Sequence, residues 1–227
     1  VKGNRKKKDR RWDVQSLDEL VNPNVSAINK IRQWIEGAES ECTVLEPSEA
    51  RSRALLAVQM PTDSILGALA YETGGILVDR GWLRLLGGGN PNFARNLADW
   101  NAERAEDLCL VADDVVGGFF AINRGAFDAD RDMYYWSPDR LAWERIGFDF
   151  EFFFRWLLFC DLGDFYQHLR WRNWASDVAD HLSADHCFAF HPPLWTADAS
   201  VTLSHRHVLS AAELYDLKLA DRRRAGL

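Results

Sequence analysis

Acidic side chains are the first groups in this sequence that could do chemistry. Asp113 and Asp114 are adjacent at the end of a predicted strand, and Asp128, Asp130 and Asp132 follow beside a predicted hairpin. Acidic clusters can transfer protons or bind metal ions. The run from Asp128 to Asp132 lacks the glycine and the closing glutamate of a calcium loop. We therefore interpret those three residues as solvated turn aspartates.

A group of histidines with one cysteine is the second candidate. Zinc needs ligands that converge in a tetrahedron, and zinc-binding sequences usually show Cys-x-x-Cys or His-Glu-x-x-His spacing. The chain has neither spacing, so no metal site is predicted. The residues concerned are His181, His186, Cys187, His191, His205 and His207.

The glycine run 87–89 is the third candidate. A phosphate-binding loop aims backbone amides at one point and is usually followed by a lysine. Here no Gly-Lys-Ser/Thr follows, and Pro91 removes an amide. An ordinary loop over 87–101 is predicted, and no cofactor is expected. The chain also lacks the Gly-x-Ser-x-Gly turn of a nucleophilic serine, so no catalytic residue is assigned.

The spacing of apolar residues predicts the elements that must position these groups. Their order is typical of an α+β domain, in which helices pack on a mixed or antiparallel sheet. Helices are expected at 27–38, 65–70 and 149–159, over 162–182 with a break near Arg170, and from a Ser210/Glu213 capping box onward. Strands are expected at 42–45, 56–60, 76–78, 82–86, 108–112, 116–122, 133–136, 143–146, 186–190 and 202–209.

Five glycines are predicted to shape the backbone. Gly74 and Gly75 should end a helix. Gly117 and Gly118 should form a bulge or a close approach, and Gly125 should lie in a hairpin turn.

Charge divides the 227-residue chain in two. The net charge is −7, of which residues 1–11 carry +6, so the remainder carries −13. We predict a basic, flexible tail over 1–22 and a single α+β domain over 23–227. An acidic body repels phosphate, so nucleic acid is not the expected partner.

The absence of a long apolar segment bears on location. The densest apolar run, 152–160, is far shorter than a membrane span and contains Arg155. No targeting segment is recognisable, and Cys42, Cys109, Cys160 and Cys187 are too scattered to suggest bridges. We expect a cytoplasmic protein without a membrane partner.

Several motifs in order resemble a known family. They are Thr73–Gly87, Asp113–Asn123, Tyr134–Asp139, Arg170–Trp174 and His191–Trp195. Together they are similar to a bacterial family known as domain of unknown function 2625, over roughly residues 45–215. More distantly, the order of elements resembles the SUKH superfamily. That likeness implies a SUKH-like α+β core with C-terminal additions, and many SUKH domains are immunity proteins that neutralise toxins.

A partner-binding surface is therefore the leading hypothesis. An acidic body suits a basic partner such as a toxin, and we predict a binding surface around Asp113, Asp114, Tyr135, Asp139 and Glu144. Eighteen of the 28 aromatic residues lie between Phe119 and Trp174, which is more than a partner surface needs, so most must be core.

Two alternatives stay open. Some of the aromatic residues in 134–136 or 171–174 could form a homodimer face or another partner surface. An enzyme could use Asp113 and Asp114 with His191 or His207.

Overall fold

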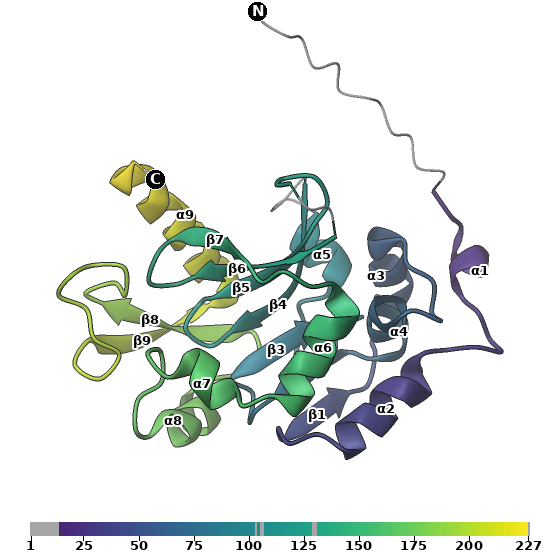
Figure 1. Cartoon of the computed structure of the whole chain (residues 1–227), viewed down its shortest axis with the longest axis horizontal. Helices are drawn as coiled ribbons and strands as arrows, with labels where there is room; N and C mark the ends of the chain where they lie inside the picture. The colour runs from purple at the N-terminus through teal and green to yellow at the C-terminus, as the bar shows by residue number, and fades with distance from the viewer. Residues whose placement is uncertain (1–13, 103, 105–106, 129–130, 227) are drawn as a thin grey trace, which may run out of the picture.

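The computed structural model describes residues 14–102, 104, 107–128 and 131–226, and its centre is a seven-stranded antiparallel sheet (Figure 1). The strands lie in chain order, each pairing with the next. They are β1 (Cys42–Leu45), β2 (Gly75–Val78), β3 (Leu83–Leu86), β4 (Leu108–Asp114), β5 (Phe119–Asn123), β6 (Met133–Ser137) and β7 (Ala142–Arg145). The predicted α+β class, with an antiparallel sheet and helices, is confirmed.

Nine helices and a second, two-stranded sheet surround this meander within the described residues. The helices are α1 (Leu17–Leu20), α2 (Ile28–Glu36), α3 (Arg51–Val58), α4 (Ile65–Glu72), α5 (Leu97–Asn101), α6 (Phe150–Phe159), α7 (Leu162–Tyr166), α8 (Trp174–His181) and α9 (Ala211–Ala225). The second sheet pairs β8 (His186–His191) with β9 (His205–Ser210). Figure 1 shows β8, β9 and α9 at one end of the molecule and α1 to α4 at the other.

The middle of the sheet is covered on both faces. Every residue of β5 and β6 is buried, although successive side chains point to opposite faces. On one face, Phe119 meets Tyr215 of α9 at a ring distance of 5.0 Å. On the other face, Phe120 meets Phe153 of α6 at 5.0 Å. The sheet is therefore the central layer of three, which explains why its strands read as nearly continuous apolar runs.

The prediction of a strand over 56–60 is wrong, because this segment belongs to α3 and its end. Ala54, Leu55 and Val58 are buried at helical spacing, whereas Leu56 is 38% exposed. Gln59 then ends the helix in the left-handed conformation, with φ of 53°. The alternation that suggested a strand was too short to distinguish the two periods.

Two other predictions met different outcomes. The predicted loop over 87–101 contains α5, which Asn96 caps by accepting hydrogen bonds from the amides of Ala98 and Asp99. The predicted break near Arg170 is confirmed, since α7 and α8 are separate helices.

Strands β8 and β9 and helix α9 belong to the same hydrophobic core as the meander. The Phe188 amide of β8 donates to the Val115 carbonyl at 2.7 Å, and Cys187, Phe188 and Leu214 join the single core cluster. The predicted Ser210/Glu213 capping box is present at the start of α9. No helix among the described ranges is both long and apolar enough to cross a membrane.

The N-terminal boundary lies earlier than the predicted tail of 1–22 implies. Residues 1–13 lie outside the described part of the chain. Leu20 of α1 is fully buried, and its carbonyl accepts a hydrogen bond from the Thr62 amide at 2.9 Å. The backbone amide of Asn22 also donates to the Thr62 hydroxyl. The segment 16–22 is therefore part of the folded domain.

This boundary can be tested by truncating a side chain. We expect Leu20→Ala to lower the free energy of unfolding by about 2–4 kcal/mol, because it leaves a cavity in a closed core. Val14, which is 79% exposed, provides the control, and Val14→Ala should change stability by less than about 0.5 kcal/mol. Urea denaturation measures both variants. Equal stability of the two would mean that residues 16–22 do not contribute to the folded domain.

Candidate functional site

Asp113 and Asp114 occupy the last two positions of β4 and are both fully buried. The expectation that they lie on an exposed surface is therefore wrong. The burial has a structural cause, because β4 is an inner strand flanked by β3 and β5. Neighbouring residues of a strand point to opposite faces, and the two carboxylates enter separate environments.

Asp113 lies at the centre of a buried ionic network, which we call the Asp113 network. Arg84 stands directly opposite it on β3, and its Nε donates to Asp113 Oδ1 at 2.6 Å. Arg95 also pairs with Asp113 and reaches Asp185, with Nε to Oδ1 at 3.1 Å. Two arginines thus face two aspartates, so the network carries no net charge.

The Asp113 network joins the meander to β8 and the segment before it. Arg84 also donates to the carbonyls of His186 and Asp114 and to the Cys187 sulfur. A buried arginine needs such partners, because an unpaired charge in the interior costs several kcal/mol. Asp113 therefore has a structural role, and no part of it reaches solvent.

Asp114 is held on the other side by a compact set of donors. Its Oδ1 accepts from the amides of Val116 and Gly118 at 3.0 and 2.7 Å, and its Oδ2 accepts from the Tyr135 hydroxyl at 2.8 Å. Burial raises the pKa of Asp114 against the lowering effect of these hydrogen bonds. Burial and the neighbouring Asp114 also raise the pKa of Tyr135.

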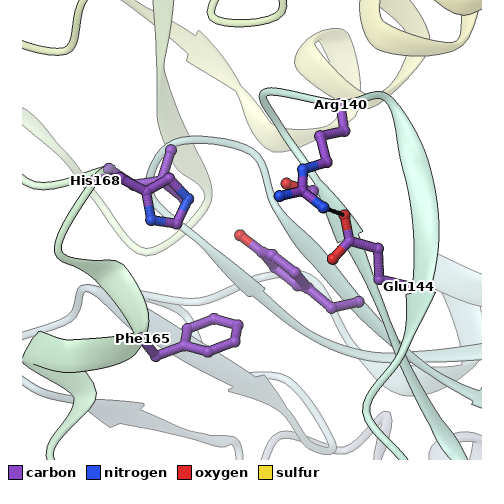
Figure 2. A pocket seen from close by; sticks show the side chains of 7 residues that line it. Arg140, Glu144, Phe165 and His168 are labelled. Atoms are coloured by element: carbon purple, nitrogen blue, oxygen red, sulfur yellow. Dashed lines mark hydrogen bonds and ion pairs between the residues drawn. The ribbon is translucent and has the colours of Figure 1, made fainter.

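The ring of Tyr135 links this buried site to a small surface cleft, which we call the Tyr135 cleft. Its volume is about 80 Å³. Figure 2 shows Arg140, Glu144, Phe165 and His168 arranged around it. The full lining is Tyr135, Ser137, Arg140, Glu144, Phe165, His168 and Leu169.

The cleft has an aromatic floor and a charged rim. The rings of Tyr135 and Phe165 meet edge to face at 5.3 Å. Arg140 Nη1 contacts Glu144 Oε1 at 2.9 Å, and the two side chains are 68% and 43% exposed. His168 Nε2 lies 3.7 Å from Asp139 Oδ2, beyond hydrogen-bonding distance.

Two of the five predicted binding residues, Tyr135 and Glu144, therefore line this cleft, and a third, Asp139, lies beside it. Tyr135 and Glu144 are direct cross-strand partners on β6 and β7. Asp139 lies in the turn between these strands and accepts from the Ser137 hydroxyl. Asp114 lies behind Tyr135, whereas Asp113 belongs to the other face. Whether any of them binds a partner stays a prediction.

Sequence reasoning missed Arg140, Phe165 and His168. Arg140 is in the predicted turn after Pro138 and could have been included. Phe165 and His168 come from α7 and the segment after it, and no local pattern indicates that this helix packs against β6. The aromatic segment 134–136 is buried, with 4–7% exposure, so it does not form the exposed face that was considered.

The five predicted glycines occupy tight places. Gly75, Gly117 and Gly125 have positive φ. A Cβ on Gly74 would come within 2.4 Å of the Glu46 carbonyl oxygen, and one on Gly118 within 2.3 Å of both Asp114 Oδ2 and the Tyr135 hydroxyl. Helix α4 ends at Glu72, before Gly74. Only at Gly118 does the missing side chain directly serve the candidate site, since it makes room for the Asp114–Tyr135 pair.

The histidines do not build an alternative site with the aspartates. His191 stands opposite His205 at the end of the small sheet, and both are exposed. His207 is exposed as well, whereas Asp113 and Asp114 are closed off from solvent. Across the residues that the structure describes, no group of three or more His, Cys, Asp or Glu side chains could hold a metal ion.

The fold and the cleft define an α+β domain built on a sequential antiparallel meander. The chain belongs to the family described as "Protein of unknown function DUF2625", whose model matches residues 17–214. It is 39% identical over 202 residues to an uncharacterised protein of Haemophilus influenzae, covering 85% of this chain and 88% of that protein. It is 35% identical over 211 residues to the uncharacterised Escherichia coli protein YbfG, covering 90% and 96%. No solved structure matches the chain.

Removing one charge from the Asp113 network tests its structural role. We expect Asp113→Asn to lower the free energy of unfolding by about 3–5 kcal/mol, because two buried arginines lose their shared carboxylate. The exposed pair Arg80–Glu41, at 3.4 Å, provides the control, and Glu41→Gln should cost less than about 1 kcal/mol. A loss for Asp113→Asn as small as that of the control would show that the network is dispensable for stability.

The raised pKa of Asp114 predicts a pH dependence of stability. Because the folded state holds this proton more tightly than the unfolded chain, stability falls as pH rises from the ordinary value of 3.8 through the raised pKa. Asp114→Asn keeps the shape of the protonated side chain and can donate to Tyr135. We therefore expect this variant to gain stability relative to the wild type as pH rises above 3.8.

Urea titrations across this pH range measure the difference between the two proteins. Asp63→Asn, at an exposed position, controls for the same chemical change in solvent. If the free energy of unfolding of the wild type instead increased relative to that of Asp114→Asn as pH rises, the pKa of Asp114 would be lowered in the folded state.

Proposed function

We propose that this protein is a non-enzymatic binding module that takes an arginine or lysine side chain of a basic partner protein into the Tyr135 cleft. The observation that carries the proposal is the arrangement of the cleft itself, which has an aromatic floor and the carboxylate of Glu144 on its rim, with the carboxylate of Asp139 beside the lining residues Ser137 and His168. Aromatic faces attract cations, and carboxylates accept hydrogen bonds from them.

The size of the cleft favours a single side chain over a metabolite. Pockets for small molecules usually enclose about 300–1,000 Å³, whereas this cleft encloses about 80 Å³. The volume of the charged end of an arginine or lysine side chain is of the same order as that of the cleft. A partner that supplies one such anchor would gain further contacts on the surface around it.

An intramolecular contact supports the binding of a guanidinium at this rim. Arg140 of the same hairpin forms a salt bridge with Glu144, and both side chains are largely exposed. Exposed ion pairs are worth little, about 0–1 kcal/mol, so an incoming arginine could displace Arg140 at small cost. The charge of −13 on residues 12–227 would speed the approach of a basic protein.

The resemblance to SUKH domains extends this proposal to a narrower role. Immunity proteins of that superfamily neutralise toxins, and a basic toxin would fit the charge of this domain. A toxin-neutralising role is the specific form of the binding function that we propose.

The first step of the test is to capture the partner at the cleft. A photo-crosslinking amino acid in place of His168, which is 56% exposed at the rim, should link one basic protein in lysate of the native organism. The same amino acid in place of Arg32, an exposed residue of α2, should not. Mass spectrometry identifies the linked protein.

The second step measures the affinity of the purified partner. We expect Glu144→Arg to weaken binding by about tenfold or more, or about 1.4 kcal/mol, because it replaces an attractive charge by a repulsive one. Glu151→Arg is a matched control, since Glu151 is 49% exposed and paired with Lys30 at 2.7 Å. Equal affinity of the two variants would rule the cleft out as the binding site.

Self-association is a second candidate function, favoured by the aromatic residues of α6. Phe152 is 55% exposed and packs on Phe148 at a ring distance of 5.0 Å. Sedimentation of the same purified protein separates the two functions. A stable dimer that Phe152→Glu dissociates, without any partner captured at position 168, would favour self-association.

A further inference from the structure

Helix α9 carries a lysine where an apolar side chain is expected. Its buried stripe consists of Ala211, Leu214, Tyr215, Lys218 and Asp221, at helical spacing. Lys218 is only 8% exposed, and lysine is almost never buried without a charged partner. The side chain also lines a small cleft, which packing alone does not explain.

The amine of Lys218 is weakly satisfied. Its Nζ donates to the Pro138 carbonyl at 3.4 Å, which is a long hydrogen bond. No carboxylate of the described chain lies within 4.0 Å of it. An ammonium has three donors, so two of them have no protein acceptor among the described residues.

The cleft that Lys218 lines is mostly apolar, and we call it the Lys218 cleft. It encloses about 40 Å³, enough for roughly three or four non-hydrogen atoms next to the opening. Asp221 accepts a hydrogen bond from the Trp195 indole at 3.3 Å, and Lys218 is the one cationic residue of the lining.

We propose that Lys218 binds a small apolar aldehyde in this cleft as a Schiff base. The free amine attacks the carbonyl carbon, a C–N bond forms, and the nitrogen loses its protons as the oxygen leaves as water. The product is an imine, and no oxidant or reductant is required. The apolar walls receive the alkyl group of the aldehyde.

The ionisation of Lys218 supports this chemistry. Burial lowers its pKa to about 8, against the opposing effects of Asp114, Cys187, Asp139 and Asp221. Near neutral pH the free amine is then about two orders of magnitude more abundant than at an ordinary lysine with a pKa of about 10.4. Desolvated lysines of this kind are the usual nucleophiles of Schiff-base enzymes.

The surrounding charges favour a neutral guest over an anion. A carboxylate ligand would enter beside Asp221 and near Asp139, and like charges in a poorly solvated place repel one another. An aldehyde avoids this repulsion because it is uncharged. The site is also distinct from the Tyr135 cleft, whose lining it does not share.

The test uses the full chain, propanal and borohydride. Borohydride reduces an imine to a stable secondary amine, and peptide mapping by mass spectrometry locates the propyl group. Lys30 serves as the comparison within the same molecule, because its side chain is 47% exposed. At pH 7 we expect at least about tenfold more adduct at Lys218 than at Lys30, and this ratio should fall as pH rises and ordinary amines lose their protons.

Two variants sharpen the result. Lys218→Arg keeps a cation but cannot form an imine, so the adduct on that peptide should vanish while labelling of Lys30 is unchanged. Leu217→Ala keeps the lysine and widens the mouth of the cleft, since Leu217 is 40% exposed there. It should raise labelling by longer aldehydes such as hexanal severalfold. Labelling of Lys218 at or below the level of Lys30 in the wild type would overturn the proposal.

Discussion

The four charges of the Asp113 network constrain the whole architecture. Arg84 and Asp113 are fully buried and Arg95 is nearly so, whereas the Asp185 side chain stays 25% exposed, and the buried charges are tolerated because their partners are in place. Arg84 and Asp113 come from adjacent strands of the meander, Arg95 from the segment before α5, and Asp185 from the segment before β8. Loss of β4 would leave the buried Arg84 without a carboxylate, and loss of residues 185 and 186 would remove one carboxylate from Arg95 and one carbonyl acceptor from Arg84. The small C-terminal sheet is thus integral to the domain, although it shares no strand with the larger one.

Strand β4 places a structural side chain on one face of the sheet and a side chain next to the candidate site on the other. Asp113 and Asp114 are neighbours in sequence, yet the pleat of β4 turns one toward the ionic network and the other toward Tyr135. The first side chain fixes the position of the strand. The second connects the buried core to the Tyr135 cleft through one hydroxyl, and the lack of a Cβ at Gly118 keeps room for that contact. The rim residues lie at the surface and are free of the constraints that govern the core.

Much of the fold could be predicted from the sequence, because local periodicity determines it. The antiparallel strands from 76 onward, the α7–α8 break and the capping box of α9 follow from spacing and caps. Helix α3 was missed because a five-residue alternation fits either period. The Asp113 network could not be predicted from the sequence. Arg84 reads only as an interruption of an apolar strand until the register of β3 and β4 is known. For the same reason, Tyr135 and Glu144 could be placed together from one hairpin, but Phe165 and His168 could not.

The position of Asp185 and His186 has a consequence for the order of folding during synthesis. The ribosome releases β1 to β7 well before β8, so Arg84 and Asp113 emerge while one carboxylate and one carbonyl acceptor of the network are still missing. Chains acquire their structure from the N-terminus as they are made, but here the centre of the sheet is completed by residues near the other end. The arginines of the nascent meander therefore stay incompletely paired until the last fifth of the chain has been synthesised and has packed against the sheet.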